Sequence, residues 1–141
     1  MSDKNISTIH WNFWTIVAIA LVWNVMGVVN FFMQMNPDVL AMYPESERAI
    51  IEARPLWATA GFALAVFGGA IGCIFLLFKK QVSLYFFIGS LIGVLVTMIH
   101  TLSIGIDFAV AELLGIILMP VIVAAFLIWY TLHVQGKSWL R

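Results

Sequence analysis

Charged residues are scarce in this chain of 141 residues. It has seven lysines and arginines and seven aspartates and glutamates, 10% of the total, while 63% of its residues are hydrophobic. A soluble domain carries roughly a quarter charged residues, so the composition excludes an ordinary soluble protein. The formal net charge is zero, which excludes nucleic-acid binding through an overall positive charge. We expect one membrane-embedded domain over residues 1–141.

Cysteine and groups of catalytic residues are lacking as well. The single cysteine, Cys73, lies in an apolar stretch, so no disulfide can form within the chain. No Ser-His-Asp arrangement, pair of catalytic carboxylates or phosphate-binding glycine loop can be assembled. One deep histidine and one deep glutamate leave a tetrahedral metal ion short of ligands. We therefore predict no enzyme, no metal site and no cofactor, and we expect His10 and His133 to anchor at the membrane interface rather than bind haem.

Long apolar runs are what the sequence has in place of charge. Four of them, at about residues 11–34, 56–78, 82–102 and 108–130, approach the ~20 residues that a helix needs to cross a ~30 Å hydrocarbon core. Aromatic residues bracket these runs, as is typical of the membrane interface. The first run is too long for a signal-peptide core and should stay uncleaved. The predicted fold is an all-α membrane protein, a four-transmembrane-helix antiparallel bundle.

The basic residues predict the orientation of this bundle. One side holds the N-terminus, the turn between the second and third runs, and the C-terminal tail, with Lys4, Lys79, Lys80, Lys137 and Arg141. The opposite side has only Arg48 and Arg54. Because cytoplasmic loops carry the excess of Lys and Arg, we predict that both termini are cytoplasmic.

Residues 35–55 form the one sizeable loop, on the predicted outer side. Asn36-Pro37 is typical of an N-cap followed by proline at the first helical position. A second short helix should run through ESERAIIEAR, with Ala49, Ile50 and Ala53 on its apolar face and its charged residues in water. The charged residues expected in water are Glu47, Arg48, Glu52 and Arg54, of which Arg48 can pair with Glu52. We expect short amphipathic helices lying on the membrane here.

Two further features shape the last two spans. The turn between them has Gly105 at a plausible C′ position and Asp107 at a plausible N-cap. Pro120 should free the carbonyl of Ile116 and kink the fourth span.

Rows of small residues predict where helices approach closely. These residues are Gly61, Ala65 and Gly69 in the second span and Gly89 and Gly93 in the third. Such rows let helix backbones pack in lipid. The favoured interpretation is packing within the chain, and the alternative is a face that pairs with a second copy.

Polar side chains of all four spans fall at a similar depth near the outer side. The candidate ligand-binding residues are Asn30, Gln34, Thr59, Thr97, His100, Thr101 and Glu112. Because ionisable groups are costly in lipid, we expect His100 and Glu112 to satisfy each other, directly or through one water. Two interpretations stay open: these groups only hold helices together, or they line an outward-facing cleft for a small polar solute or a proton.

The chain also resembles a known family. The segments WNVMGVVNFFMQMNP, PLWATAGFALAVFGGAIGCIFLLFKK and VTMIHT resemble small bacterial inner-membrane proteins with four predicted helices, often automatically named "sugar transporter". The resemblance covers about residues 11–104. It implies the four-helix architecture, a bacterial inner-membrane location and, by the family's name only, a sugar-like solute.

Two functions follow as hypotheses. The first is a module that binds or transports a small polar solute through the outward-facing cleft. The second is an accessory or scaffold protein that self-associates or docks to a partner membrane protein. Both place the chain in a lipid bilayer, and neither involves nucleic acid.

Overall fold

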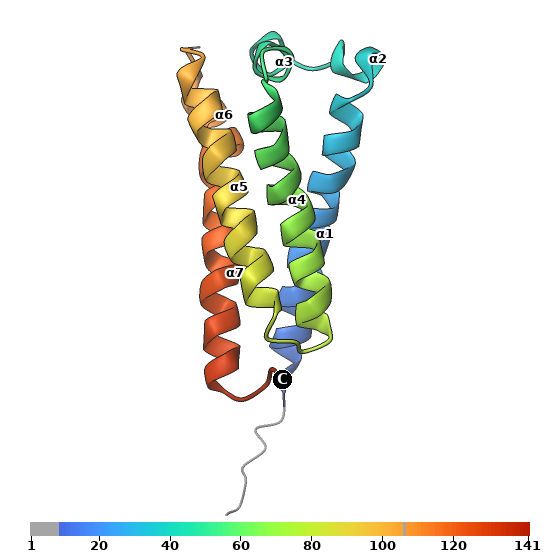
Figure 1. Cartoon of the computed structure of the whole chain (residues 1–141), viewed down its shortest axis with the longest axis vertical. Helices are drawn as coiled ribbons and strands as arrows, with labels where there is room; N and C mark the ends of the chain where they lie inside the picture. The colour runs from blue at the N-terminus through green and yellow to red at the C-terminus, as the bar shows by residue number, and fades with distance from the viewer. Residues whose placement is uncertain (1–8, 106) are drawn as a thin grey trace, which may run out of the picture.

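The structure is a computed structural model, and it describes residues 9–105 and 107–141. The described residues form helices and no strand. In order they are α1 Trp11–Gln34, α2 Pro37–Leu40, α3 Glu45–Glu52, α4 Leu56–Leu77, α5 Ser83–Ser103, α6 Val110–Leu113, the π-helix η1 Leu114–Leu118, and α7 Met119–Gly136. The all-α fold and the bundle of four long apolar helices are confirmed. Figure 1 shows these helices side by side, with α2 and α3 at one end and the C-terminal residues at the other.

The four long segments have the length and composition of membrane spans, which makes this a multi-pass membrane protein. They contain 24, 22, 21 and 27 residues, the last combining α6, η1 and α7. At ~1.5 Å rise per residue each exceeds the ~30 Å hydrocarbon core. The first three helices lie within one residue of the expected bounds. The fourth begins at Val110 and continues to Gly136, beyond the expected end at Tyr130, because an aromatic pair marks an interface and does not itself break a helix.

The helices pack in the order α1, α4, α5, α7, and the α4–α5 pair is the most extensive contact. Glycines make this contact possible: a Cβ atom added at Gly61 would lie 2.6 Å from Cγ1 of Val96, and one added at Gly93 would collide with the backbone of Gly61 and Ala65. The Ser90 hydroxyl donates to the carbonyl of Ala65 across the same contact, at 2.6 Å. Gly89 differs, because its added Cβ would meet only Leu64 at 3.7 Å.

Asn24, which was not among the predicted site or packing residues, contributes to the contact between α1 and α4. Its side-chain amide donates to the carbonyl of Ala20 at 2.8 Å and to the sulfur of Cys73 at 3.7 Å. A Cβ at Gly69 would overlap this amide group. The predicted small-residue position Gly69 therefore accommodates a polar side chain of α1.

A hydrophobic core closes the bundle at the end opposite α3. It joins all four long helices through a buried set that includes Phe13, Val17, Leu76, Phe87, Leu127, Tyr130 and Val134. The tail is fixed beside the α4–α5 turn, where the Arg141 N–H donates to the Lys79 carbonyl at 2.7 Å and the Gln81 N–H donates to the Arg141 carbonyl at 2.9 Å. The core and the fixed tail hold the four long helices together at this end.

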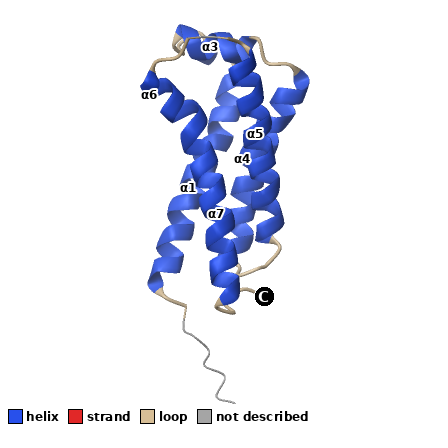
Figure 2. Cartoon of the chain, turned by 90° about the vertical axis from the view of Figure 1, so that its left-hand side faces the viewer, coloured by secondary structure: helices blue, strands red, loops and turns tan. Residues whose placement is uncertain are grey.

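The fourth span changes direction where Pro120 was expected to disturb it. The disturbance is the π-helix η1, which directly precedes the proline-containing first turn of α7. Proline has no N–H to bond the carbonyl four residues earlier, and a π segment is one way to accommodate the resulting mismatch. Figure 2 shows α6 leaning away from α5 at the α3 end.

Most of the caps and contacts predicted for the connecting segments are present in the structure. The Asn36 side chain accepts from the Asp38 N–H at 2.9 Å and caps α2, and Gly105 has the positive φ, 71°, expected after a helix end. Arg48 and Glu52 form the expected ion pair at 4.0 Å. The prediction for Asp107 was wrong: the N-cap is Ala109, whose N–H donates to the Glu112 carboxylate at 3.1 Å. A glutamate at the third helical position supplies the acceptor that this N-terminus needs.

Candidate functional site

The four long helices and α3 line a cavity of about 970 Å³, called the central cavity. Apolar side chains form most of its wall. Its polar lining residues are Asn24, Asn30, Gln34, Glu47, Arg54, Ser90, Thr97, Thr101 and Glu112. The volume lies at the upper end of the ~300–1,000 Å³ typical of small-molecule sites.

The cavity exists because α1 and the fourth span separate toward the α3 end. Among the described residues, α1 packs on α4 and α7 packs on α5, without comparable contact between α1 and α7. These two helices approach at the opposite end, where the Phe13 and Tyr130 rings lie 6.4 Å apart. Of the α1 residues that line the cavity, Met26 is 63% and Val29 51% exposed. The cavity is therefore open between α1 and the fourth span, toward the surface that faces lipid.

Helix α3 covers the end of the cavity. Its Ile50 is buried, at 4% exposure, and it lines the cavity with Glu47 and Ile51. The helix is attached on two sides: the Ser46 hydroxyl donates to Glu112 of α6 at 3.1 Å, and the Ile50 carbonyl lies 3.3 Å from Nε2 of His100 on α5. The amphipathic helix in this loop is confirmed, and its apolar face packs onto the bundle.

Arg54, between α3 and α4, lines the cavity with a cationic group. Its Nη1 donates to the Gln34 side-chain oxygen at 2.9 Å, and its guanidinium carbon lies 4.8 Å from the centre of the Phe62 ring. Its Nε is buried without a hydrogen-bond partner. Burial lowers the pKa of this guanidinium from its usual value. Glu47 and Arg54, which were expected in water, are both half-buried and line the cavity.

Five of the seven predicted site residues line the central cavity: Asn30, Gln34, Thr97, Thr101 and Glu112. Asn30 accepts a hydrogen bond from the Tyr43 hydroxyl. The two threonine hydroxyls donate to backbone carbonyls one turn earlier, from Thr97 to Gly93 at 2.9 Å and from Thr101 to Thr97 at 3.0 Å. These hydroxyl protons are already used within α5.

His100 and Thr59 do not line the cavity. The His100 ring is buried, at 4% exposure, and meets the Trp57 ring edge to face at 5.8 Å. The Thr59 hydroxyl donates to the Pro55 carbonyl at 3.3 Å. Similar depth in the membrane brought these residues into the prediction, but depth does not determine which way a helical side chain points.

His100 and Glu112 were expected to satisfy each other directly or through one water, and the direct hydrogen bond does not form. His100 bonds to the Ile50 carbonyl, whereas Glu112 accepts from Ser46 and from the Ala109 N–H. No ion pair joins them in the described part of the chain. The physical reason is that His100 faces α3 and α4, while α6 leans away from α5 and its Glu112 caps its own helix.

Four polar residues that line the cavity were not predicted as site residues: Asn24, Glu47, Arg54 and Ser90. Asn24 and Ser90 had a usable signal, since each is a polar residue in the middle of an apolar run. The two charged residues had no comparable signal, because charged side chains in a loop ordinarily lie in water.

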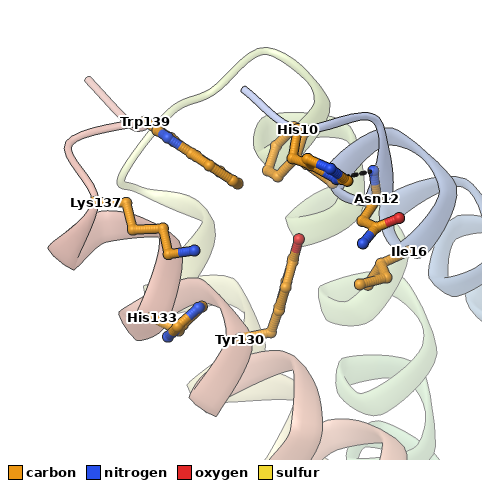
Figure 3. Close-up of a pocket in the computed structure, with 8 residues that line it drawn as sticks. His10, Asn12, Ile16, Tyr130, His133, Lys137 and Trp139 are labelled. Carbon is orange, nitrogen blue, oxygen red and sulfur yellow. Dashed lines mark hydrogen bonds between the residues drawn. The ribbon is translucent and has the colours of Figure 1, made fainter. Parts of the chain in front are cut away.

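A second, smaller pocket of about 260 Å³ lies at the end opposite α3 (Figure 3). It is lined by His10, Asn12, Phe13, Ile16, Tyr130, His133, Lys137 and Trp139. Nδ1 of His10 accepts from the Asn12 N–H at 3.3 Å, and Nζ of Lys137 lies 5.0 Å from the Trp139 ring centre. The His133 ring stacks on Trp129 at 5.3 Å. Amphipathic rings in this arrangement suit the interfacial anchoring expected for the two histidines.

Within residues 9–105 and 107–141, no group of three His, Cys, Asp or Glu side chains is placed to hold a metal ion. Comparison with protein-family models, with curated proteins and with solved structures finds no match. The resemblance to the bacterial four-helix family therefore stays a prediction.

Proposed function

We propose that this membrane protein binds a small solute with polar groups in the central cavity. The observation that carries the proposal is the convergence of polar side chains from α1, α5, α6 and α3 on one apolar-walled space of about 970 Å³. Polar groups inside apolar spans are costly and usually mark a function. A few such groups on an otherwise apolar wall are typical of ligand sites.

The predicted orientation places this cavity on the outer side of a bacterial inner membrane. The basic residues at the end opposite α3 support that orientation through the positive-inside rule, and the family resemblance supports the bacterial location. A solute would then reach the cavity from outside the cytoplasm, and a sugar-like solute is the one that the family's name suggests.

A scaffold role is the second candidate function. It is favoured by the hydrogen bonds of Thr59, Thr97, His100 and Thr101, all of which involve backbone carbonyls of this same chain. Those four residues have structural partners already. Ligand binding then depends above all on Arg54, whose Nε is buried without a hydrogen-bond partner.

Filling the cavity tests the binding proposal. Gly115 lines the cavity and a Cβ there would meet nothing within 4 Å, so Gly115→Leu should fold and occupy part of the space. Gly136→Leu is the matched control, because Gly136 also has open surroundings and does not line the cavity. Thermal unfolding in a non-ionic detergent is measured with glucose, leucine and dihexanoyl phosphatidylethanolamine as probes.

We expect at least one probe to raise the Tm of the wild type and of Gly136→Leu. At a concentration of ~100 Kd the rise should be about 5–10 °C. The same probe should leave the Tm of Gly115→Leu unchanged. If all three proteins respond alike, or none responds to any probe, the cavity is not a binding site and the scaffold role is favoured.

A further inference from the structure

The central cavity contains charges that do not neutralise one another. Its ionisable lining residues are Glu47, Arg54 and Glu112. In the described residues the one ion pair within 4.0 Å is Arg48–Glu52, which lies outside the cavity. A partly buried charge without a counter-charge is unfavourable unless something else compensates it.

Arg54 is prepared to bind an anionic group. Its partners in the structure are neutral, the Gln34 amide oxygen and the Phe62 ring, and its Nε is buried without a hydrogen-bond partner. A guanidinium has five N–H donors in a planar fork that matches the oxygens of a carboxylate or phosphate. A ligand anion would supply the negative charge that the protein does not provide here.

The two carboxylates line the cavity from the other elements. Glu112 is on α6 and Glu47 is on α3, whereas Arg54 contacts α1 and α4. Each Glu112 oxygen accepts one hydrogen bond, from Ser46 or from the Ala109 N–H. An ionised carboxylate has about four acceptor positions, so Glu112 can also accept from an ammonium group. One site therefore presents a cation and two anions.

The wall of the cavity at its opening is apolar, which favours a ligand with an apolar chain. Trp23, Met26, Val29 and Met33 line it from α1, and Ile116 and Ile117 line it from η1. The four α1 residues are exposed, so this wall continues from the cavity to the lipid-facing surface. An apolar chain of a ligand could lie along it and enter the bilayer.

We propose that the central cavity binds a zwitterionic amphiphile. Its carboxylate or phosphate bonds to Arg54, its ammonium group bonds to Glu112 and Glu47, and its apolar chain leaves between α1 and η1. This chemistry has two sources, an aminophospholipid of the bilayer or a free amino acid with an apolar side chain. The inference rests on the binding function proposed above and specifies the class of ligand.

Calorimetric titration in a non-ionic detergent tests the inference with four probes. Dihexanoyl phosphatidylethanolamine has both charges and apolar chains, dihexanoyl phosphatidylglycerol lacks the ammonium group, phosphoethanolamine lacks the chains, and leucine is the soluble zwitterion. We expect the first to bind, and the second and third to bind at least ~10-fold more weakly, because each loses one of the three interactions. Binding of leucine at similar strength indicates the soluble source, and its absence indicates the lipid.

Variants then test which charged side chain binds which charged group of the ligand. Arg54→Gln should weaken phosphatidylethanolamine binding by at least ~10-fold, because it removes a charge-assisted hydrogen bond, and Arg54→Lys should restore part of it. Glu112→Gln should reduce the preference for phosphatidylethanolamine over phosphatidylglycerol. Arg48→Gln is the matched control: it removes the same charge from the same loop, outside the cavity, and should bind like the wild type.

The possible failures are distinguishable. The inference of a zwitterionic ligand is wrong if phosphatidylethanolamine and phosphatidylglycerol bind equally, or if a folded Arg54→Gln binds like the wild type. Either result leaves the proposed binding function intact. The proposed function also stands, without the zwitterion, if glucose binds and no zwitterionic probe binds, provided that Gly115→Leu abolishes the binding of glucose. Absence of binding by every probe overturns both.

Discussion

At the scale of single residues, His100 and Glu112 have separate hydrogen-bond partners. Both were expected at matching depth, and the structure gives each its own partners, the Ile50 carbonyl for His100 and Ser46 with the Ala109 N–H for Glu112. Their energetic roles should therefore be separate, although a shared interior position had suggested a pair.

A double-mutant cycle measures that separation. His100→Gln, Glu112→Gln and the double variant should have additive effects on the free energy of unfolding, with a coupling below ~0.5 kcal/mol. His100→Gln alone should cost about 1–3 kcal/mol, because it disturbs a buried hydrogen bond and the contact with Trp57. Reversible unfolding in mixed micelles gives these values. A coupling above ~1 kcal/mol would point to an interaction through a bridging water.

Prediction from sequence succeeded where helical spacing indicated which face of the helix a residue occupies, and it failed where depth alone was the guide. Asn30 and Gln34 were found because α1 is regular and their spacing places them on one stripe, and both line the cavity. His100 and Thr59 have suitable depths but point to α3 or to their own backbone. Arg54 could not have been found, since only the position of α3 over the bundle brings this loop residue to the cavity.

At the scale of helices, close approach of α4 and α5 is the main determinant of the bundle. Hydropathy predicted these spans well because each must cross the same thickness of hydrocarbon. Small residues predicted the contact, since Gly61 and Gly93 leave no room for a Cβ. The separation of α1 from the fourth span could not be predicted, because it depends on tilt and on the π segment, which hydropathy does not report.

Gly93 and Gly89 give a matched test of the helix contact. Gly93→Ala should destabilise the protein by about 1–3 kcal/mol, because its Cβ would collide with the backbone of α4. Gly89→Ala should be neutral or stabilising by up to ~1 kcal/mol, since its Cβ meets only Leu64 at 3.7 Å and alanine is the better helix former. The measurement is the free energy of unfolding of both variants. Equal effects would mean that α4 and α5 lie farther apart than described.

At the scale of the whole molecule, one end holds the hydrophobic core and the other holds the central cavity. The core of Phe13, Leu76, Phe87 and Leu127 joins all four long helices at the end opposite α3. The orientation of this asymmetric molecule in the membrane decides which compartment the cavity serves. Charge distribution predicts the outer side, and labelling can test it.

Single cysteines at Met42 and Ser138 lie at the two ends of the molecule, and both positions are exposed. An impermeant thiol reagent applied to intact cells should label Met42→Cys and leave Ser138→Cys unlabelled until the membrane is permeabilised. The parent protein is the control, because its Cys73 is fully buried. The reverse pattern would place the central cavity on the cytoplasmic side.

The π segment η1 joins two helices, α6 and α7, of which α7 is held more firmly than α6. On one side α7 is fixed by the core, and on the other α6 is joined to α3 by the hydrogen bond from Ser46 to Glu112. A rotation of ~10° at η1 moves the start of α6, roughly 6–12 Å away, by ~1–2 Å, enough to break that bond. The cavity opening therefore widens when this hydrogen bond breaks and narrows when it forms. A ligand that draws Glu112 away from Ser46 loosens α6, and faster amide exchange in α6 becomes the measure of occupancy.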